Sequence, residues 1–459
     1  MYDVIVIGAG ISGLYATWKL EQQGLSVLLL EKKDRIGGRL KTVERNGKKF
    51  DVGGIRYSLT HHKKLAKLCK DLSIENGEHR VYPQHTKDVR FIKNTLKTIS
   101  NSFSEKELKS NTIEYFLRRI ESSSQVGRFI QAWGYSGNLQ NAQAYWFLKS
   151  TSSMYNDGRM YYMKSGFGNL ISILRQNIQS EIKTTCGVRN IEKDIRVGFK
   201  IYMEDETVYH SKKVICALPP EALLKMNYFD KHRTILSTVT SNNYIRIFGE
   251  IETKQKFLSH SGNELIPQTI SRGDGIVQLA YADSKKAEYL RNSYLNGTFP
   301  TKEIVEKFQL GPDPKWVESF YWKNGTHYWN PYVDVENTYK SILNPDNDLF
   351  IVGEAFSKKQ AWIEGALETV DDALMFKPIR PGKHLSLKKK RVVKKDAHWV
   401  IYRGIKYDVT KYEKNHPGGN VIKIGRGKDI TEMFDSVPHS EFARNILMNL
   451  PILDNNSPT

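Results

Sequence analysis

"YDVIVIGAGISG" (residues 2–13) joins an apolar run to a glycine-rich turn. A continuous apolar run of this kind is typical of a parallel strand that is buried on both faces of its sheet. After the turn, residues 14–23 predict a helix that ends at Gly24, and residues 26–30 predict a second strand that closes on Glu31. Together these elements form a complete βαβ unit, which predicts an α/β nucleotide-binding domain.

The residues of this unit have separate tasks. Gly8 permits the tight turn, Gly10 lets the backbone approach a pyrophosphate, and Gly13 lets the helix pack closely against the strand. Ser12, in the same turn, is expected to contact the cofactor, and Glu31 is expected to accept hydrogen bonds from a ribose. Because an acidic Glu31 would repel a 2′-phosphate, the unit favours FAD or NAD over NADP.

A second segment decides between FAD and NAD. Residues 35–39 (RIGGR), just after Glu31, resemble the glycine-glycine-arginine segment of the flavin amine oxidase family. The resemblance implies FAD, with Arg39 supplying positive charge and hydrogen-bond donors to a phosphate. Some members of that family bind flavin through a cysteine, but the corresponding residues 323–329 contain none. The implied FAD is therefore non-covalent.

Two later segments resemble further cofactor contacts of the same family. Residues 185–188 (TCGV) resemble the strand in which the backbone of a valine, here Val188, meets the adenine. Residues 349–355 (LFIVGEA) resemble the last strand of the FAD-binding domain. This resemblance implies that Gly353 and Glu354 contact the flavin, with the acidic residue holding the ribityl chain.

The wall of the substrate site is also implied by resemblance. Residues 361–366 (AWIEGA) resemble the helix that begins beneath the flavin ring, so Ile363 is expected near the helix N-terminus that faces the flavin. Trp362 would form one aromatic wall, with His327 or Tyr328 opposite it. Such walls exclude water and direct the substrate C–H bond towards the flavin.

Two residues from distant parts of the chain resemble the carboxylate anchors of L-amino-acid oxidases. Residues 50–57 (FDVGGIRY) resemble a segment whose glycines, here Gly53 and Gly54, adjoin the cofactor and whose arginine, here Arg56, pairs with a carboxylate. Tyr281 matches a tyrosine that donates to the same carboxylate. The alternative for Arg56 is a structural salt bridge, in which case the substrate would be a plain amine.

One residue departs from the family pattern. The family commonly places a lysine, bridged by water to the flavin, on the strand that here reads NYIRIF (residues 243–248). Arg246 stands where that lysine is expected. Arginine keeps the charge but is bulkier and essentially never deprotonates. Fast reaction of the reduced flavin with oxygen is therefore not expected.

The C-terminal part of the chain has a different character. Residues 377–395 contain nine basic and no acidic residues, which predicts a solvated linker or, alternatively, a peripheral contact with a membrane surface. Residues 396–456 resemble the cytochrome b5 family, with two short strands in 399–410, an HPGG motif at His416 and a second histidine, His439. The resemblance implies haem b with both histidines as axial ligands, an arrangement that transfers electrons and binds no substrate.

The predicted fold is an α/β, Rossmann-like FAD-binding domain interleaved with an α+β substrate domain, followed by a small α+β cytochrome b5-like domain. The expected parts are 1–60, 170–238 and 324–376 for the FAD-binding domain, 61–169 and 239–323 for the substrate domain, 377–395 for the linker, and 396–456 for the haem domain.

The residue set implies FAD-dependent oxidative deamination of an L-amino acid by hydride transfer to the flavin, with electrons passing to oxygen, to the fused haem, or to both. The first alternative is a monoamine or polyamine oxidase. A flavin desaturase or porphyrinogen oxidase is a further alternative from the same fold, and the tryptophan-containing helix segment fits it less well. The last alternative is a non-catalytic scaffold that binds flavin and haem.

Composition limits the partners. The net charge is +19 over 459 residues, but the basic residues are scattered and no nucleic-acid motif occurs, so no specific nucleic-acid partner is expected. Cys69, Cys186 and Cys216 match no disulfide or zinc pattern, which indicates buried thiols in a reducing compartment. The chain begins with a strand and contains no apolar run of about 20 residues, which predicts an intracellular, soluble, cytoplasmic protein. The oligomeric state is left open.

Overall fold

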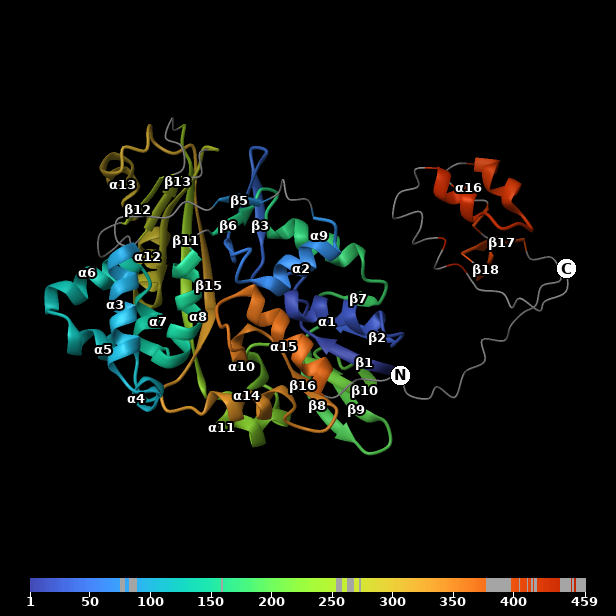
Figure 1. Ribbon diagram of the computed structural model, residues 1–459, viewed down its shortest axis with the longest axis horizontal. Helices are drawn as coiled ribbons and strands as arrows, with labels where there is room; N and C mark the ends of the chain where they lie inside the picture. The colour runs from blue at the N-terminus through green and yellow to red at the C-terminus, as the bar shows by residue number, and fades with distance from the viewer. Residues whose placement is uncertain are drawn as a thin grey trace. The chain divides into compact units, whose positions relative to one another are not determined.

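The computed structural model divides the chain into two compact units, Met1–Gly382 and Lys383–Thr459, which are described separately (Figure 1). The division lies within the basic stretch 377–395, and that stretch is outside the described residues. The structure describes residues 1–74, 79–81, 89–157, 160–252, 258–261, 268–271, 274–376, 398–403, 405–410, 412–413, 416, 419–437, 447 and 450.

The first strand lies inside a seven-stranded sheet, as the apolar run predicted. Strand β1 (Tyr2–Ile7) pairs in parallel with β2 (Val27–Leu30) on one side and with β10 (Val208–Cys216) on the other. Val4 and Val6 belong to one hydrophobic core, and Ile5 and Ile7 belong to another, so both faces of the strand are buried. The remaining strands of this sheet are β7 (Glu181–Lys183), β8 (Val188–Asp194), β9 (Gly198–Met203) and β16 (Leu349–Ile351).

Helix α1 (Ile11–Glu21) follows the glycine-rich turn and packs against α9 (Phe167–Gln176) and α15 (Ile363–Phe376). It begins three residues earlier than the predicted start at residue 14, because the end of the glycine-rich segment is already helical. In Figure 1, α15 runs alongside α1 although the two are far apart in sequence. The first and last parts of the FAD-binding region therefore share one core.

A second, antiparallel sheet forms another part of the first unit. Its strand order is β12 (Leu258–Ser261), β13 (Gln268–Ser271), β14 (Ile276–Asp283), β11 (Val239–Glu250) and β15 (Val317–Trp329). A group of helices gathers beside this sheet at the left of Figure 1. They are α3 (Val89–Ser102), α4 (Glu105–Ser110), α5 (Ile113–Ile120), α6 (Ser123–Trp133), α7 (Ser136–Asn141) and α8 (Ala144–Asp157).

The two sheets are interleaved along the chain, because β10 leads into β11 and β15 leads back to β16. The predicted fold class is thereby confirmed. Two predicted segment boundaries, after residues 169 and 323, fall inside the continuous elements α9 and β15. The other boundaries stay predictions.

The rest of the first unit connects these layers. Its elements are β3 (Thr42–Arg45), β4 (Lys48–Asp51), α2 (Lys63–Asp71), β5 (His79–Val81), β6 (Tyr161–Met163), α10 (Pro220–Leu223), η2 (Asn227–His232), α11 (Arg233–Leu236), α12 (Ser284–Leu295), α13 (Thr301–Lys307), α14 (Val335–Leu343) and η3 (Glu354–Phe356).

The second unit contains the predicted pair of short strands, β17 (Trp399–Tyr402) and β18 (Ile405–Asp408), which pair antiparallel. Its other described elements are η5 (Gly419–Gly425) and α16 (Thr431–Ser436), and a small apolar core forms around Val400 and Tyr407. No helix in the described parts of either unit has the length and apolar character needed to cross a membrane.

All three cysteines are free thiols. Cys69 and Cys216 are buried, whereas Cys186 is half-buried. The expectation of buried thiols therefore holds for two of the three.

Candidate active site

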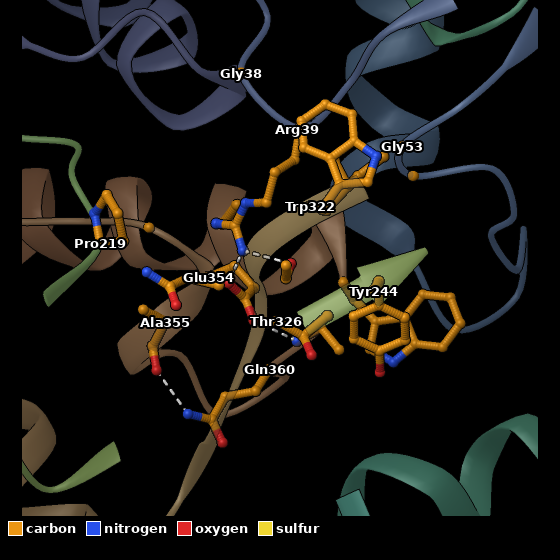
Figure 2. A pocket seen from close by; sticks show the side chains of 18 of the residues that line it. Gly38, Arg39, Gly53, Pro219, Tyr244, Trp322, Thr326, Glu354, Ala355 and Gln360 are labelled. Carbon is orange, nitrogen blue, oxygen red and sulfur yellow. Dashed lines mark hydrogen bonds and ion pairs between the residues drawn. The ribbon is translucent and has the colours of Figure 1, made fainter. Parts of the chain in front are cut away.

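A cavity of about 510 Å³ is lined by residues from both sheets of the first unit (Figure 2). Gly8 and Glu31 contribute from the carboxyl ends of β1 and β2, where parallel sheets commonly bind ligands. The sequence-predicted residues that line this central cavity are Gly8, Gly10, Ser12, Glu31, Arg39, Gly53, Gly54, Arg56, Arg246, Tyr281, Tyr328, Gly353, Glu354, Trp362 and Ile363.

The glycine-rich turn has the geometry that a dinucleotide requires. Gly8 has a φ of +99°, a conformation that side-chain-bearing residues rarely adopt. A Cβ at Gly13 would lie 1.8 Å from the Gly8 carbonyl oxygen, so only glycine lets α1 approach β1 this closely. At Gly10, by contrast, a Cβ would meet no atom within 4 Å. The cavity is open at Gly10, where the protein backbone was predicted to approach the pyrophosphate of the cofactor.

The side chain of Glu31 is held by its own neighbourhood. Its two carboxylate oxygens accept hydrogen bonds from the backbone N–H of Ala9 (2.8 Å) and of Lys33 (2.9 Å). These bonds tie the end of β2 to the glycine-rich turn and fix the carboxylate at the cavity wall. Each oxygen keeps a second lone pair for a ribose hydroxyl.

The segment after Glu31 lies directly against the turn. The N–H of Gly37 donates to the carbonyl of Ala9 (2.8 Å), and a Cβ at Gly53 would lie 1.8 Å from the carbonyl oxygen of Arg39. The N–H of Gly54 donates to that same carbonyl at 3.0 Å. Gly53 and Gly54, which follow β4, thus bring the chain against the backbone of Arg39, as Figure 2 shows for Gly53.

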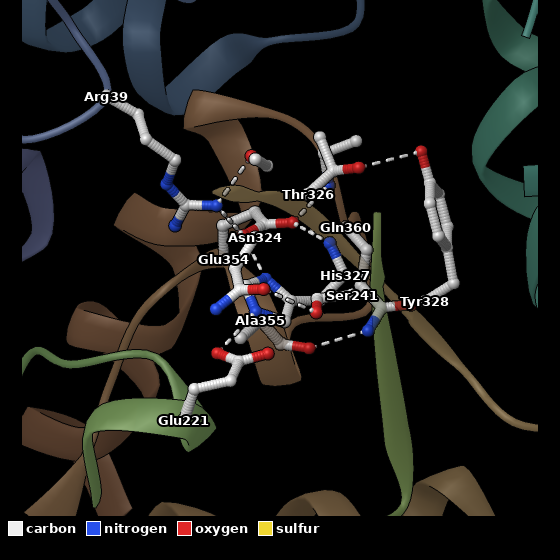
Figure 3. A network of polar contacts seen from close by, with 12 residues as sticks. Arg39, Glu221, Ser241, Asn324, Thr326, His327, Tyr328, Glu354, Ala355 and Gln360 are labelled. Carbon is white, nitrogen blue, oxygen red and sulfur yellow. Dashed lines mark hydrogen bonds and ion pairs between the residues drawn. The ribbon is translucent and has the colours of Figure 1, made fainter. Parts of the chain in front are cut away.

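Glu354 is the centre of a buried polar network (Figure 3). It follows Gly353, whose φ is +134°, and its carboxylate accepts from Arg39 Nη1 (2.6 Å), Ala361 N–H (2.8 Å) and His327 N–H (3.0 Å). The Nδ1 atom of His327 lies 3.2 Å from the same carboxylate. Burial alone would raise the pKa of Glu354, but the charges of Arg39 and His327 hold it far below its usual value. These four contacts, from three residues, engage both oxygens of the Glu354 carboxylate. The main role of Glu354 is therefore to orient residues around the cavity, and accepting hydrogen bonds from a ribityl chain is secondary.

Of the two candidates for the wall opposite Trp362, Tyr328 lines the cavity and His327 is not among the lining residues. The His327 side chain instead lies between two carboxylates. His327 is fully buried between Glu354 and Glu221, and its Nε2 atom lies 3.2 Å from the Glu221 carboxylate. Burial alone would lower the pKa of His327, but the neighbouring Glu354 and Glu221 raise it above its usual value. We therefore assign His327 as an imidazolium between two carboxylates. Glu221 had no sequence signal that indicated this role.

The two predicted carboxylate anchors meet at one end of the cavity. Arg56 and Tyr281 both line it, and Tyr135 connects them. A guanidinium nitrogen of Arg56 donates to the Tyr135 hydroxyl at 3.4 Å, and the rings of Tyr135 and Tyr281 lie edge to face with centroids 4.9 Å apart. Tyr244 completes the group, with its ring centroid 5.6 Å from that of Tyr281. Tyr135 and Tyr244 were not predicted, although Tyr244 could have been found because it lies two residues before Arg246 on one strand.

Arg246 is buried at the same end. Its side chain donates to the amide oxygen of Gln278 at 2.8 Å, and its guanidinium carbon lies 3.8 Å from the centroid of the Tyr281 ring. Tyr328, on the neighbouring strand, joins this end through a hydroxyl contact of 3.0 Å with Tyr244. This end of the cavity, here called the aromatic end, is therefore positively charged and lined by the tyrosines Tyr135, Tyr244, Tyr281 and Tyr328.

The remaining predicted residues divide into two groups. Trp362 lines the cavity and packs on His62 with ring centroids 4.7 Å apart, and Ile363 begins α15 at the cavity wall. Val188, the first residue of β8, is not among the described residues that line the cavity. The backbone N–H groups of residues 185 and 186, just before it, donate to carbonyls of the residues that follow β2. The predicted adenine contact of Val188 stays a prediction.

Comparison with known proteins places this geometry in a family. A model described as "Flavin containing amine oxidoreductase" matches residues 11–370. The chain belongs to that family. Members bind FAD, and the open cradle at Gly10 together with the close approach of Gly13 fits such a cofactor.

Relatives in the flavin-containing amine oxidoreductase family are distant. A flavin-containing amine oxidase of Oncorhynchus mykiss is 26% identical over 274 residues, covering 50% of this chain and 52% of the relative. A probable flavin-containing monoamine oxidase A of Dictyostelium discoideum is 36% identical over 85 residues, covering 18% of this chain and 17% of the relative. The chain thus spans about half or less of the length of these relatives. Cyclohexylamine oxidase from Brevibacterium oxydans has a TM-score of 0.66 at 17% identity, covering 82% of this chain and 98% of the other, which shows a shared fold.

The second unit matches a different family model. Residues 384–452 match the "Cytochrome b5-like Heme/Steroid binding domain", so this flavin amine oxidoreductase carries a b5-like domain of a type that binds haem. His416 is half-buried, and its Nδ1 atom is buried with no hydrogen-bond partner among the described residues. The same unit exposes three large apolar side chains, Val421, Ile424 and Met433. His439 lies outside the described residues, so its predicted role as the second ligand stays a prediction.

Proposed function

We propose that this protein oxidises the Cα–N bond of an L-amino acid. The amino acid loses two electrons and two protons to become an imino acid, which water hydrolyses to a keto acid and ammonia. Bound FAD supplies the two-electron acceptor for this step. The contribution of the chain is to bind the carboxylate, exclude water and direct the Cα–H bond.

The charge at the aromatic end carries the proposal. Arg56 and Arg246 line it together with the hydroxyl-bearing Tyr281, whereas the acidic lining residues among those described are Glu31 and Glu354. Glu31 lies at the glycine-rich turn, and Glu354 is neutralised by Arg39 and His327. The guanidinium groups of Arg56 and Arg246 would attract a carboxylate and repel a cationic amine.

The substrate would be anchored by two different groups. Arg56 supplies a planar guanidinium suited to bidentate carboxylate binding, and the Tyr281 hydroxyl supplies a further donor. Tyr135, in contact with both, fixes their relative position. Trp362 and Tyr328 then flank the rest of the substrate and limit water at the reacting carbon.

Matched substrate pairs test this function. Anaerobic absorbance titration near 450 nm with mixed L-amino acids, and then with the corresponding amines that lack the α-carboxylate, should bleach the flavin with the amino acids alone. Arg56→Met should raise KM for the amino acid about 100-fold with a smaller change in kcat, because it removes a charge-assisted pair. Bleaching by those amines or by polyamines alone would favour the amine-oxidase alternative, which the names of the relatives also suggest.

A second part of the proposal concerns the electron outlet. The lysine expected near the flavin is replaced by Arg246, and a b5-like domain is present in the same chain. Both features support haem as an electron acceptor that competes with oxygen. Stopped-flow mixing of substrate-reduced protein with air should show ferrous haem bands before the flavin reoxidises. Haem that stays ferric throughout would contradict this part.

A further inference from the structure

The positive charge of Arg246 is not balanced by its contacts with the described residues of the protein. It lies in the middle of β11, opposite Tyr281 in the register of β11 and β14, and it is 5% exposed while lining the central cavity. Its partners in the described structure are the amide oxygen of Gln278 and the ring face of Tyr281. Both are neutral groups.

A buried guanidinium needs an anion. Arginine does not release its proton in proteins, so burial cannot be relieved by neutralisation. No aspartate or glutamate among the described residues forms an ion pair with Arg246, and the nearby Asp283 is instead bonded to the backbone N–H groups of Ser136 and Gly137. A cation–π contact offsets only part of the cost of removing such a charge from water. The missing counter-charge must therefore enter the cavity with a ligand.

The carboxylate of the proposed substrate already has a partner in Arg56. Arg56 contacts Tyr135, whereas Arg246 stacks on Tyr281, so the two arginines contact different rings of this pair. With the substrate α-carboxylate assigned to Arg56, Arg246 remains for a second anionic group of the ligand.

We propose that Arg246 binds a second negatively charged group, and that the substrate is a dicarboxylic L-amino acid of the glutamate or aspartate class. This inference rests on the proposed amino-acid oxidation and names its substrate class. Gln278 positions the guanidinium by accepting from one nitrogen, which leaves the others to donate to the second carboxylate. Arg246 is thus a specificity-determining residue.

Isosteric substrates test the proposal on the full-length holoprotein. Anaerobic flavin reduction by L-glutamate and L-aspartate should exceed that by L-glutamine and L-asparagine by about 100-fold in kcat/KM, since each pair differs by one charge. A readout without turnover is the flavin absorbance shift on binding glutarate or succinate, which should saturate at lower concentration than the shift with butyrate.

Variants test whether the preference for a second carboxylate comes from Arg246 itself or from positive charge in general. Arg246→Gln should reduce the glutamate-to-glutamine ratio about 100-fold and abolish the preference for glutarate over butyrate, whereas Arg246→Lys should keep part of both. Arg291→Gln is the matched control, because Arg291 also packs on a tyrosine ring, that of Tyr321, but is exposed and outside the cavity lining. It should leave both ratios unchanged.

The outcomes distinguish this inference from the proposed function. If glutamine or a neutral amino acid reduces the flavin as well as glutamate, the inference is overturned while amino-acid oxidation stands. If only amines without a carboxylate reduce it, both fail. Should Arg246→Gln lose FAD or its thermal transition, the Arg246→Lys variant and the dicarboxylate binding of the unaltered protein still decide the matter.

Discussion

His327 is held in a buried chain of alternating charge that runs from Arg39 through Glu354 to Glu221. Its pKa is raised above 6.5, so its stabilising effect is complete below pH 6.5 and is lost as pH rises through the folded pKa. The pKa of Glu354 is lowered below 4.5, so its effect is present above pH 4.5 and is lost as pH falls through the folded pKa. The network therefore stabilises the fold most between pH 4.5 and pH 6.5, where both contributions are complete.

Replacing the imidazolium tests this network. His327→Leu should lower the free energy of unfolding by about 3 kcal/mol at pH 6, because it leaves two carboxylates facing an apolar group. His327→Gln, which keeps hydrogen bonding, should lower it less. Urea unfolding of the two variants across pH measures the effect. A difference from the unaltered protein that grows above pH 7 would contradict the assignment of a charged His327.

Asp283 is a second buried titrating group beside the aromatic end. Burial raises its pKa to about 6, although the N–H groups of Gly137 and Ser136 and the charge of Lys286 act in the opposite direction. It accepts from Ser136 N–H (3.0 Å) and Gly137 N–H (2.8 Å), which follow Tyr135 in sequence. Asp283 is therefore a positioning residue for Tyr135, and through Tyr135 for Arg56.

The raised pKa fixes the sign of the expected pH effect. The folded state retains the proton of Asp283 more tightly than the unfolded chain, so its contribution is present below pH 3.8 and is lost as pH rises through about 6. The Tm of the unaltered protein relative to Asp283→Asn should fall as pH is raised from about 4 to 6 and then stay level, as scanning calorimetry would measure. The variant should also raise KM more than it lowers kcat. A Tm difference that widens with pH would rule out this account.

Residue roles were predictable where a family motif fixed the backbone and unpredictable where only packing decided. Arg56 and Tyr281 were expected together and meet through Tyr135. His327 and Tyr328 stayed alternatives because they are adjacent in one motif, and only the packing around β15 shows that Tyr328 lines the cavity while His327 lies between Glu354 and Glu221. Sequence spacing alone does not fix the register of β15.

At the scale of elements, the β1–turn–α1 unit offers a matched pair of substitutions. A Cβ at Gly13 would overlap the Gly8 carbonyl, so Gly13→Ala should force α1 away from β1 and cost about 3 kcal/mol of unfolding free energy. A Cβ at Gly10 meets no protein atom, so Gly10→Ala should cost less than about 1 kcal/mol yet weaken FAD binding at least tenfold. Chemical unfolding and the flavin absorbance of purified protein separate the two effects. Equal stability losses would contradict the distinction.

The elements of the FAD-binding region were readable from sequence because each is a short apolar strand next to a glycine-rich segment. Strands β1 and β2 occur where the apolar pattern predicted them, and β16 occurs within residues 349–355, which resemble a strand of the family. The helices α3–α8 had no such signal. They form their own core around Phe116, Phe129 and Leu139, and that packing depends on tertiary contacts that no local motif encodes.

At the scale of the whole molecule, flavin and haem chemistry belong to separate units. If His416 is a haem ligand as predicted, His416→Ala in the full chain should remove the haem Soret band. It should leave the flavin absorbance and its bleaching by substrate unchanged, because His416 lies outside the unit that holds the central cavity. His398→Ala is the control, since His398 bonds to Glu413 in the same unit and has no predicted ligand role. Retention of the Soret band in His416→Ala would show that another residue holds the iron.

The interleaving of domains was predictable because family-like segments recur on both sides of each insertion. The exact boundaries were not, since α9 and β15 run continuously across two of them. A domain boundary that passes through an unbroken helix or strand leaves no glycine-, proline- or charge-rich signal in the sequence.

The pairing of β1 with β10, and of β10 with β16, also determines when the sheet can form during protein synthesis. Strand β1 must wait for partners that are encoded much later in the chain, a delay on the order of tens of seconds at ordinary rates of synthesis. During that interval β1 lacks its pairing with β10, and the wall of the central cavity formed by Gly353 and Glu354 has not yet been made. A complete FAD site therefore exists only after β16 and the residues that follow it have been synthesised.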